Sequence, residues 1–302
     1  MKNTPDIYHL FFLSCAIITG VIVILMFGFI FWTAIPVFRQ EGINYILGSV
    51  WDYNLNRYGI FLFIIGTFAV TIVTLILAVP LGVLTAIYLA ELAPRSVEKV
   101  IRPLIELLVG IPSIVYGLFG FLFLRYFFRD TVDPLIGSSG IPFFRNVDIA
   151  GGTNILLAAF ILTIMVIPTI VALSQDAMRA VPQDYREGSL SLGATRWETV
   201  TLVVIPAAWS GIITSIVLAM MRAMGETMAV VMVAGNSAQA PPSILSPVYP
   251  MTAKMLNDIG SHSIEPIARS ALFGIAAVLF VIEILFVISA RLLSNYLRRS
   301  ME

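Results

Sequence analysis

Long apolar stretches separated by short polar segments dominate the hydrophobic pattern of this chain. Each stretch carries few or no charged residues and reaches the roughly 20 residues that a helix needs to cross the hydrocarbon core of a bilayer. A helix suits such a stretch, because it satisfies its own backbone hydrogen-bonding groups where no water is available. The pattern predicts six membrane-spanning helices, over Leu10–Pro36, Tyr58–Ala90, Pro103–Leu124, Asn154–Gln175, Val200–Met221 and Ser270–Ala290.

Two details modify this simple picture. The Tyr58–Ala90 stretch is longer than the hydrocarbon core, so we expect it to tilt or to project beyond the membrane. Pro112 removes a backbone donor and predicts a bend in the third span, with Ser113 or a neighbouring helix satisfying the carbonyl it frees. Between spans, the Gly- and Pro-rich segments Arg125–Thr153 and Gly235–Pro266 favour irregular surface structure.

Composition agrees with an all-α integral membrane protein. Of 302 residues, 59% are hydrophobic and only 12% are charged, which is more apolar surface than a soluble domain can bury. The formal net charge is zero, so no overall field favours nucleic acid. Cys15 is the only cysteine, which excludes an internal disulfide, and the sequence places His9 and His262 in no metal-ligand pattern.

Lys and Arg predict the orientation. Cytoplasmic segments of membrane proteins are enriched in these residues, and the enrichment here favours both termini in the cytoplasm of a multi-pass protein of the cell membrane. The first span is too long for a secretory signal and is interpreted as a retained anchor. The inner basic residues are then Lys2, Arg95, Lys99, Arg102, Arg179, Arg186, Arg196, Arg291, Arg298 and Arg299; the outer ones are Arg39, Arg57, Arg125, Arg129, Arg145, Lys254 and Arg269.

The pattern of apolar stretches and charges also divides the chain into three parts. Residues 1–59 form an anchor helix with an outer segment, residues 60–295 form the main transmembrane domain, and residues 296–302 form a cytoplasmic tail. The sequence shows no internal repeat and no second soluble domain.

The inner loop Asp176–Thr199 carries the clearest local signals. Pro182 suits the start of a short helix, and Glu187 lies within its first turns, where the helix dipole favours an acid. Gly193 can end that helix in a left-handed conformation, and Thr195 can cap the next one. This predicts a helix-turn-helix that docks on a cytoplasmic partner, with an apolar side formed by Leu190, Leu192 and Trp197.

Two charged residues lie at membrane depth. Arg222 and Glu226 follow the fifth span, and the apolar run resumes after them, so the sequence predicts one continuous helix through both. Four positions apart on such a helix, they share a face and can pair. Intramembrane charges usually face a bundle interior or a pathway. Two interpretations stay open: a structural ion pair, or an Arg222 that binds an anion through its planar fork while Glu226 orients it.

The chain is not expected to be an enzyme. No Gly-Lys pair occurs, so the phosphate-binding loop G-x-x-x-x-G-K-[ST] of ATPases is missing. If ATP drives this protein, the ATP and Mg²⁺ belong to a partner chain. A passive channel remains the alternative from another class.

The inner loop resembles a family signature. Permeases of binding-protein-dependent ABC importers carry Glu-Ala-Ala, three residues, Gly, nine residues, Ile, one residue and Leu-Pro. This chain has Glu187-Gly-Ser, the same gaps to Gly193 and Val203, and then Ile205-Pro206. Together with the segments from Glu106 to Gly117 and from Arg222 to Asn236, it is similar to the C-type permeases of phosphate-specific (Pst) importers.

The resemblance implies a type I ABC importer permease fold with a cytoplasmic coupling helix. It implies inward transport of inorganic phosphate, with an A-type permease as heterodimer partner, two ATPase subunits, an extracytoplasmic phosphate-binding protein and the surrounding lipid. Arg222 and Glu226 match pathway positions of that family, and Glu187 and Gly193 match coupling positions. Alternatives are another oxyanion, such as phosphonate, sulfate or molybdate, or an ATP-independent anion channel.

Overall fold

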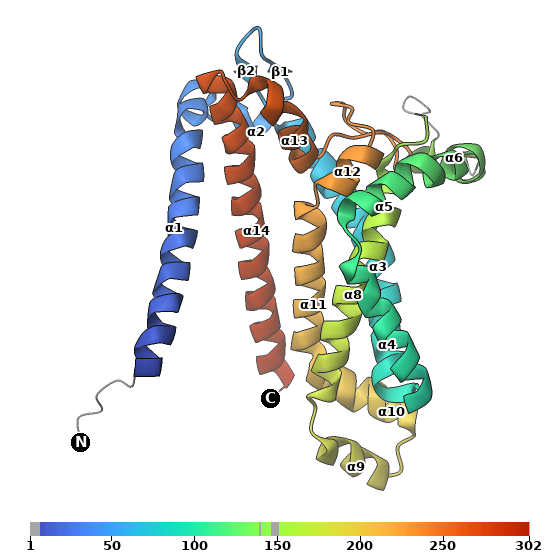
Figure 1. Cartoon of the computed structure of the whole chain (residues 1–302). Coiled ribbons are helices and arrows are strands. Elements are labelled where there is room, and N and C mark those ends of the chain that lie inside the picture. The colour runs from blue at the N-terminus through green and yellow to red at the C-terminus, as the bar shows by residue number, and fades with distance from the viewer. Residues whose placement is uncertain (1–6, 139, 146–150, 302) are drawn as a thin grey trace. The chain divides into compact units, whose positions relative to one another are not determined.

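The computed structural model describes residues 7–138, 140–145 and 151–301 of the chain (Figure 1). The chain divides into two compact units. Unit 1 comprises Met1–Phe61 and Asp258–Phe280, and unit 2 comprises Leu62–Asn257 and Val281–Glu302. The division into parts expected from the sequence stays a prediction, and residues 1–6 and Glu302 lie outside the described residues.

The predicted all-helical membrane architecture is confirmed. Within the described residues, five helices are long and apolar enough to cross a membrane, and a bent helix pair raises the number to six. The five are α1 (Ile7–Glu41), α3 (Phe61–Ile87) with the π-helical η1 (Tyr88–Leu92), α8 (Ile155–Arg179), α10 (Arg196–Thr199) with η5 (Val200–Val204) and α11 (Ile205–Gly225), and α14 (Pro266–Met301).

The bent pair is the predicted third span, and the bend at Pro112 is confirmed. Helix α4 (Arg95–Gly110) and the helical stretch Ser113–Gly137 meet at 91°. Because Pro112 cannot donate to the Leu108 carbonyl, that oxygen needs another partner, and the Tyr116 hydroxyl donates to it at 3.0 Å. The donor is therefore Tyr116, on the helix that begins after the bend, and not Ser113. The stretch comprises α5 (Ser113–Phe119), η2 (Gly120–Leu124), α6 (Arg125–Phe127), η3 (Phe128–Val132) and α7 (Asp133–Gly137).

The expectation of irregular structure between spans is partly wrong. Helical structure continues past Arg125 to Gly137, and η4 (Pro142–Phe144) follows as a single 3₁₀ turn. The segment after α12 (Met228–Val233) is irregular up to Pro250, but α13 (Met251–His262) follows it. The Thr67 hydroxyl accepts the first N–H of α13, from Met251, at 2.9 Å, which satisfies one of the donors left free at a helix start.

Unit 1 holds α1 beside the first part of α14. It also holds α2 (Asn44–Leu47), whose buried Tyr45 donates its hydroxyl to the Ala271 carbonyl at 2.7 Å. A side chain at Gly274 would come within 2.6 Å of that hydroxyl, so the glycine allows the close approach. This contact fixes α2 against α14.

A small aromatic hairpin completes unit 1. Strands β1 (Trp51–Asp52) and β2 (Arg57–Tyr58) pair antiparallel. Tyr53, in the turn, donates its hydroxyl to Asp258 and stacks on His262 with ring centroids 3.6 Å apart. Burial, followed by the Asp258 carboxylate, raises the pKa of the Tyr53 phenol well above its ordinary value.

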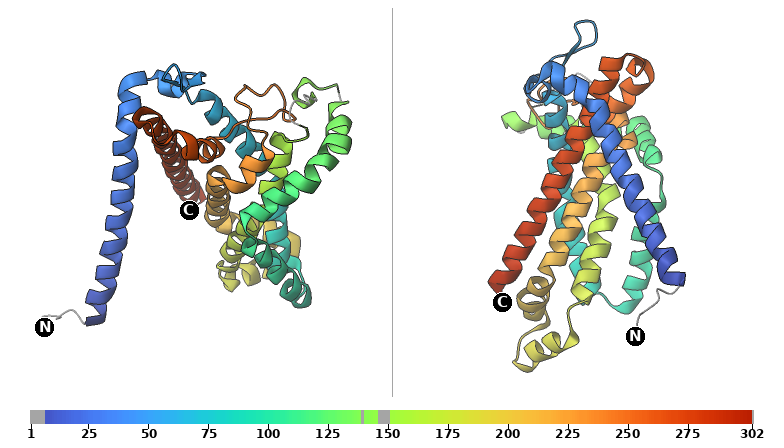
Figure 2. Two further views of the ribbon diagram at one scale, coloured as in Figure 1. Left: turned by 45° about the horizontal axis from the view of Figure 1, so that its top comes forward. Right: turned by 90° about the vertical axis from the view of Figure 1, so that its left-hand side faces the viewer.

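Helix α8 forms the centre of unit 2. It runs beside α11, and Figures 1 and 2 show the two lying together. Inside this contact, the hydroxyls of Ser174 and Ser215 lie 2.7 Å apart. Where α3 crosses α8, a side chain at Gly82 would come within 2.8 Å of Ile170, so the glycine sets the helix separation.

We expect Gly82→Val to destabilise unit 2, because the added side chain has no space beside the fully buried Ile170. Overpacking of this kind costs about 1–3 kcal/mol of unfolding free energy. Thermal unfolding in detergent measures the effect. Gly20→Val on α1 is the matched control, since nothing lies within 4 Å of a side chain there; equal melting temperatures for both variants would contradict the assignment.

Candidate transport pathway and coupling site

The predicted continuous helix through Arg222 and Glu226 is wrong. Helix α11 ends at Gly225, and Glu226 has an extended backbone with φ −67° and ψ 129°. The next helix, α12, begins at Met228. The two charged residues therefore do not share a helical face, and among the described residues they form no ion pair with each other.

Glu226 stabilises the break between α11 and α12. Its Oε1 accepts the N–H groups of Thr227 at 3.2 Å and Ala229 at 3.3 Å, at the start of α12. Its backbone carbonyl accepts the Thr252 hydroxyl at 2.8 Å. A carboxylate at a helix start satisfies free donors and complements the helix dipole, so these contacts explain why the helix restarts there.

Arg222 lies on the last turn of α11, on an exposed part of this chain. Its Nη1 lies 3.5 Å from the Thr169 hydroxyl of α8, a long hydrogen bond that leaves most of the guanidinium donors available. The structure therefore places a cation one turn before a helix break, without an acidic partner among the described residues.

The two broken helices meet. Helix α5, which follows the Pro112 bend, packs against α12, which follows the break at Glu226 (Figure 1). A side chain at Gly117 would come within 2.8 Å of the Met232 sulfur and 3.0 Å of the Ala229 Cα, so the glycine permits this contact. Discontinuous helices at membrane depth are a frequent setting for transport sites.

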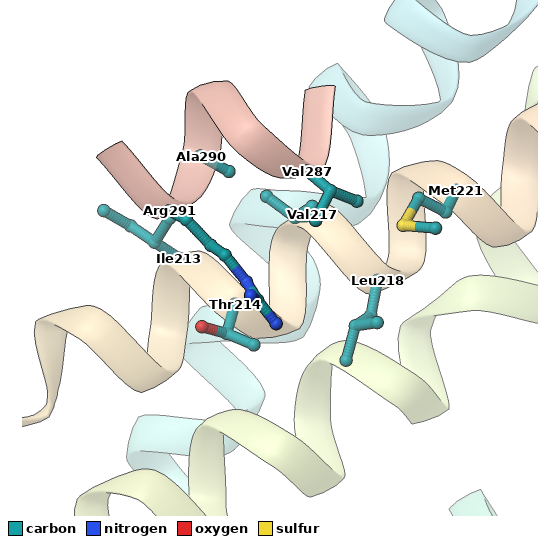
Figure 3. Close-up of a pocket in the computed structure, with 8 residues that line it drawn as sticks. All are labelled: Ile213, Thr214, Val217, Leu218, Met221, Val287, Ala290 and Arg291. Atoms are coloured by element: carbon teal, nitrogen blue, oxygen red, sulfur yellow. The ribbon is translucent and has the colours of Figure 1, made fainter. Parts of the chain in front are cut away.

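A separate groove of about 180 Å³ lies between α11 and the last part of α14. Figure 3 shows Arg291 reaching from α14 toward Thr214 of α11, with apolar side chains around it. Neither Arg222 nor Glu226 lines this groove. It is not the place where the predicted pathway residues lie.

The predicted helix-turn-helix of the inner loop is confirmed. Helix α9 (Gln183–Ser191) begins after Pro182, and Gly193 has φ +89°, the left-handed conformation that favours glycine. Thr195 caps α10, and Glu198 returns the contact to the Thr195 backbone N–H at 2.7 Å, which completes a capping box. Both Figures 1 and 2 show α9 beyond the ends of α8 and α11.

One side of this loop is exposed. Glu187 is exposed, and among the described residues its side chain forms no hydrogen bond or ion pair, while its backbone carbonyl accepts the Ser191 hydroxyl. Large apolar side chains accompany it: Leu192 is 91% exposed, Tyr185 60% and Trp197 56%. Exposed apolar surface on this scale, rimmed by polar residues, is typical of a protein interaction site.

A polar network on the other side of the loop was not predicted from the sequence. Arg186 pairs with Glu91 at 2.7 Å, with both side chains largely buried. Glu98 of α4 accepts from Arg179 of α8, and Arg102 lies 3.9 Å from Asp176. The partners lie 74 to 95 positions apart along the chain, so no local sequence pattern predicts these ion pairs.

Comparison with known proteins agrees with this architecture. Relatives include the probable ABC transporter permease protein YqgH of Bacillus subtilis, 39% identical over 79% of this chain and 72% of the relative. The phosphate transport system permease protein PstC of Mesorhizobium japonicum is 36% identical over 86% of this chain and 80% of the relative.

A solved structure shares the fold. A chain of a bacterial alginate ABC transporter, crystallised with a periplasmic protein bound to an alginate pentasaccharide, matches with a TM-score of 0.63 at 14% identity, over 98% of both chains. At that identity the likeness concerns the fold alone. Residues 78–302 match the family described as the binding-protein-dependent transport system inner membrane component. The chain belongs to this family.

Proposed function

We propose that the chain is a permease subunit of an ATP-driven importer and that it carries inorganic phosphate inward across the cell membrane. The observation that carries the proposal is its similarity to a PstC phosphate permease over most of both chains. Arg222 lies beside the break between α11 and α12 and has no acidic partner within the part of the chain that the structure describes, which supports an anionic cargo. In this proposal the chain itself has no enzymatic activity, and ATP and Mg²⁺ bind to partner ATPase subunits.

The proposed pathway residues have different tasks. Arg222 contacts the anion, because a guanidinium offers several charge-assisted hydrogen bonds to phosphate oxygens. Glu226 holds the start of α12 and so fixes the break beside Arg222. One arginine compensates only part of the charge of phosphate, so an A-type permease partner supplies the remaining donors.

The proposed coupling site is the exposed side of α9 and α10. Glu187 and the exposed apolar side chains contact an ATPase subunit, and Gly193 gives the loop its shape. Two ATPase subunits serve the two permeases, and an extracytoplasmic binding protein delivers the phosphate. This arrangement puts α9 and both termini in the cytoplasm, which agrees with the distribution of Lys and Arg.

Reconstitution tests the function. The chain, a partner permease, the ATPase subunits and the binding protein are placed in liposomes, and uptake of labelled phosphate is followed with and without ATP. Uptake that needs ATP and the binding protein supports the proposal. Stronger competition by phosphonate, sulfate or molybdate than by phosphate would identify another oxyanion as cargo, and flux without ATP would indicate a channel.

We expect Arg222→Gln to lower phosphate uptake by about 10- to 100-fold, because the charge-assisted hydrogen bonds to the anion are lost. Assembly should be preserved, since Arg222 is exposed and has one long hydrogen bond. The measurement is uptake per assembled complex. Arg39→Gln, at an exposed arginine of α1, is the control and should leave uptake unchanged. Normal uptake by Arg222→Gln would refute the pathway assignment.

We expect Gly193→Val to reduce co-purification of the ATPase, because a β-branched residue at φ +89° costs about 1–3 kcal/mol and distorts the turn between α9 and α10. Gly188→Ala is the matched control: it lies inside α9 with nothing within 4 Å and should preserve or improve recruitment. If Gly193→Val recruits the ATPase as well as Gly188→Ala does, the proposed shape of the docking loop is wrong.

A further inference from the structure

The coupling helix α9 has an inward side as well as a docking side. The Arg186 side chain is only 14% exposed, whereas Tyr185, next to it, is 60% exposed. One turn further, the Ser189 hydroxyl lies 3.0 Å from the Thr199 hydroxyl. Residues three apart lie on one side of a helix, so Arg186 and Ser189 mark the side of α9 that contacts the rest of unit 2.

Arg186 joins α9 to the end of α3. Its Nη2 lies 2.7 Å from Glu91 Oε1, and its Nε lies 3.3 Å from Glu91 Oε2, a two-point contact that fixes direction as well as distance. Glu91 belongs to η1, the π-helical end of α3, and its side chain is 10% exposed. Leu89 of η1, Val181 and Val200 form an apolar cluster in this region, so solvent screens the pair weakly.

The same guanidinium also holds the end of α8. Its Nη2 donates to the Met178 carbonyl at 2.8 Å, and its Nη1 donates to the Val181 carbonyl at 2.5 Å. These carbonyls lie in the last turn of α8 and just beyond it, where a helix lacks internal donors and favours a cation. One side chain therefore connects α9, α8 and α3.

We propose that Arg186 and Glu91 transmit the displacement of α9 to α3 during transport. Short chain segments connect α9 directly to α8 and to α10, whereas α3 is not a neighbour of α9 along the chain. A buried, two-point ion pair resists changes in both separation and angle, so α3 follows α9 when a motor subunit moves it. The inference rests on the proposed coupling function and adds positioning residues to it.

Distance measurements test the transmission. Spin labels at Leu92→Cys and Asp184→Cys, in a Cys15→Ser background, report the separation of η1 from α9 in the assembled transporter. In the otherwise native chain, this separation should stay constant between the nucleotide-free and ATP-trapped states. With Glu91→Gln it should change between them, and uptake per ATP hydrolysed should fall by about tenfold. A separation that stays constant with Glu91→Gln would overturn the proposal.

Two further variants separate transmission from folding. Arg186→Lys keeps the charge beside Glu91 but loses the planar fork, so an intermediate loss of uptake per ATP is expected; an unchanged ratio would count against the proposal. Glu106→Gln is the matched control, because it removes an ion pair of 2.9 Å whose side chains are 38% and 59% exposed, and it should change neither readout. Failure of the unaltered complex to recruit its ATPase or import phosphate would instead refute the proposed function.

Discussion

Inside a bilayer, a backbone N–H or C=O group that leaves its helix finds no water, so every break in a spanning helix needs partners from the protein. Unit 2 meets this requirement at two breaks with side chains from nearby residues. The Tyr116 hydroxyl donates to the Leu108 carbonyl, to which Pro112 has no N–H to donate. Glu226 accepts N–H groups at the start of α12. Both breaks are therefore stable parts of the fold, and the rest of the proposed pathway depends on them.

The breaks also explain how a polar site can exist among apolar helices. An unbroken α11 would direct each of its backbone groups along its own axis and offer none to a substrate. Ending α11 at Gly225 lets α12 take a new direction and pack against α5, with Gly117 providing the space. Arg222 then lies beside irregular backbone, and in the proposed pathway a desolvated anion meets both its charge and local dipoles there.

Local chemistry decided which features were predictable from the sequence. Pro182, Gly193 and Thr195 act on their immediate neighbours, so the helix-turn-helix was predicted almost residue by residue. The break after Gly225 was missed because the apolar run resumes directly after Glu226 and Thr227, and because part of its support is distant: the Thr252 hydroxyl, which donates to the Glu226 carbonyl, lies 26 positions away. The pair of Glu91 and Arg186 was missed for the same reason, since it joins segments 95 positions apart.

The ion pairs at this end of unit 2 differ in exposure, and therefore in how firmly each can connect two helices. Arg102 and Glu106 are neighbours on one helix, with side chains 38% and 59% exposed, so their interaction is screened and cannot relate α4 to another element. Arg186 and Glu91 are mostly buried and lie on different elements. A buried charge that loses its partner remains desolvated, so separating this pair is far more costly than separating an exposed one. That difference makes the buried pair a firm connection between helices and the exposed pair only a solvated contact.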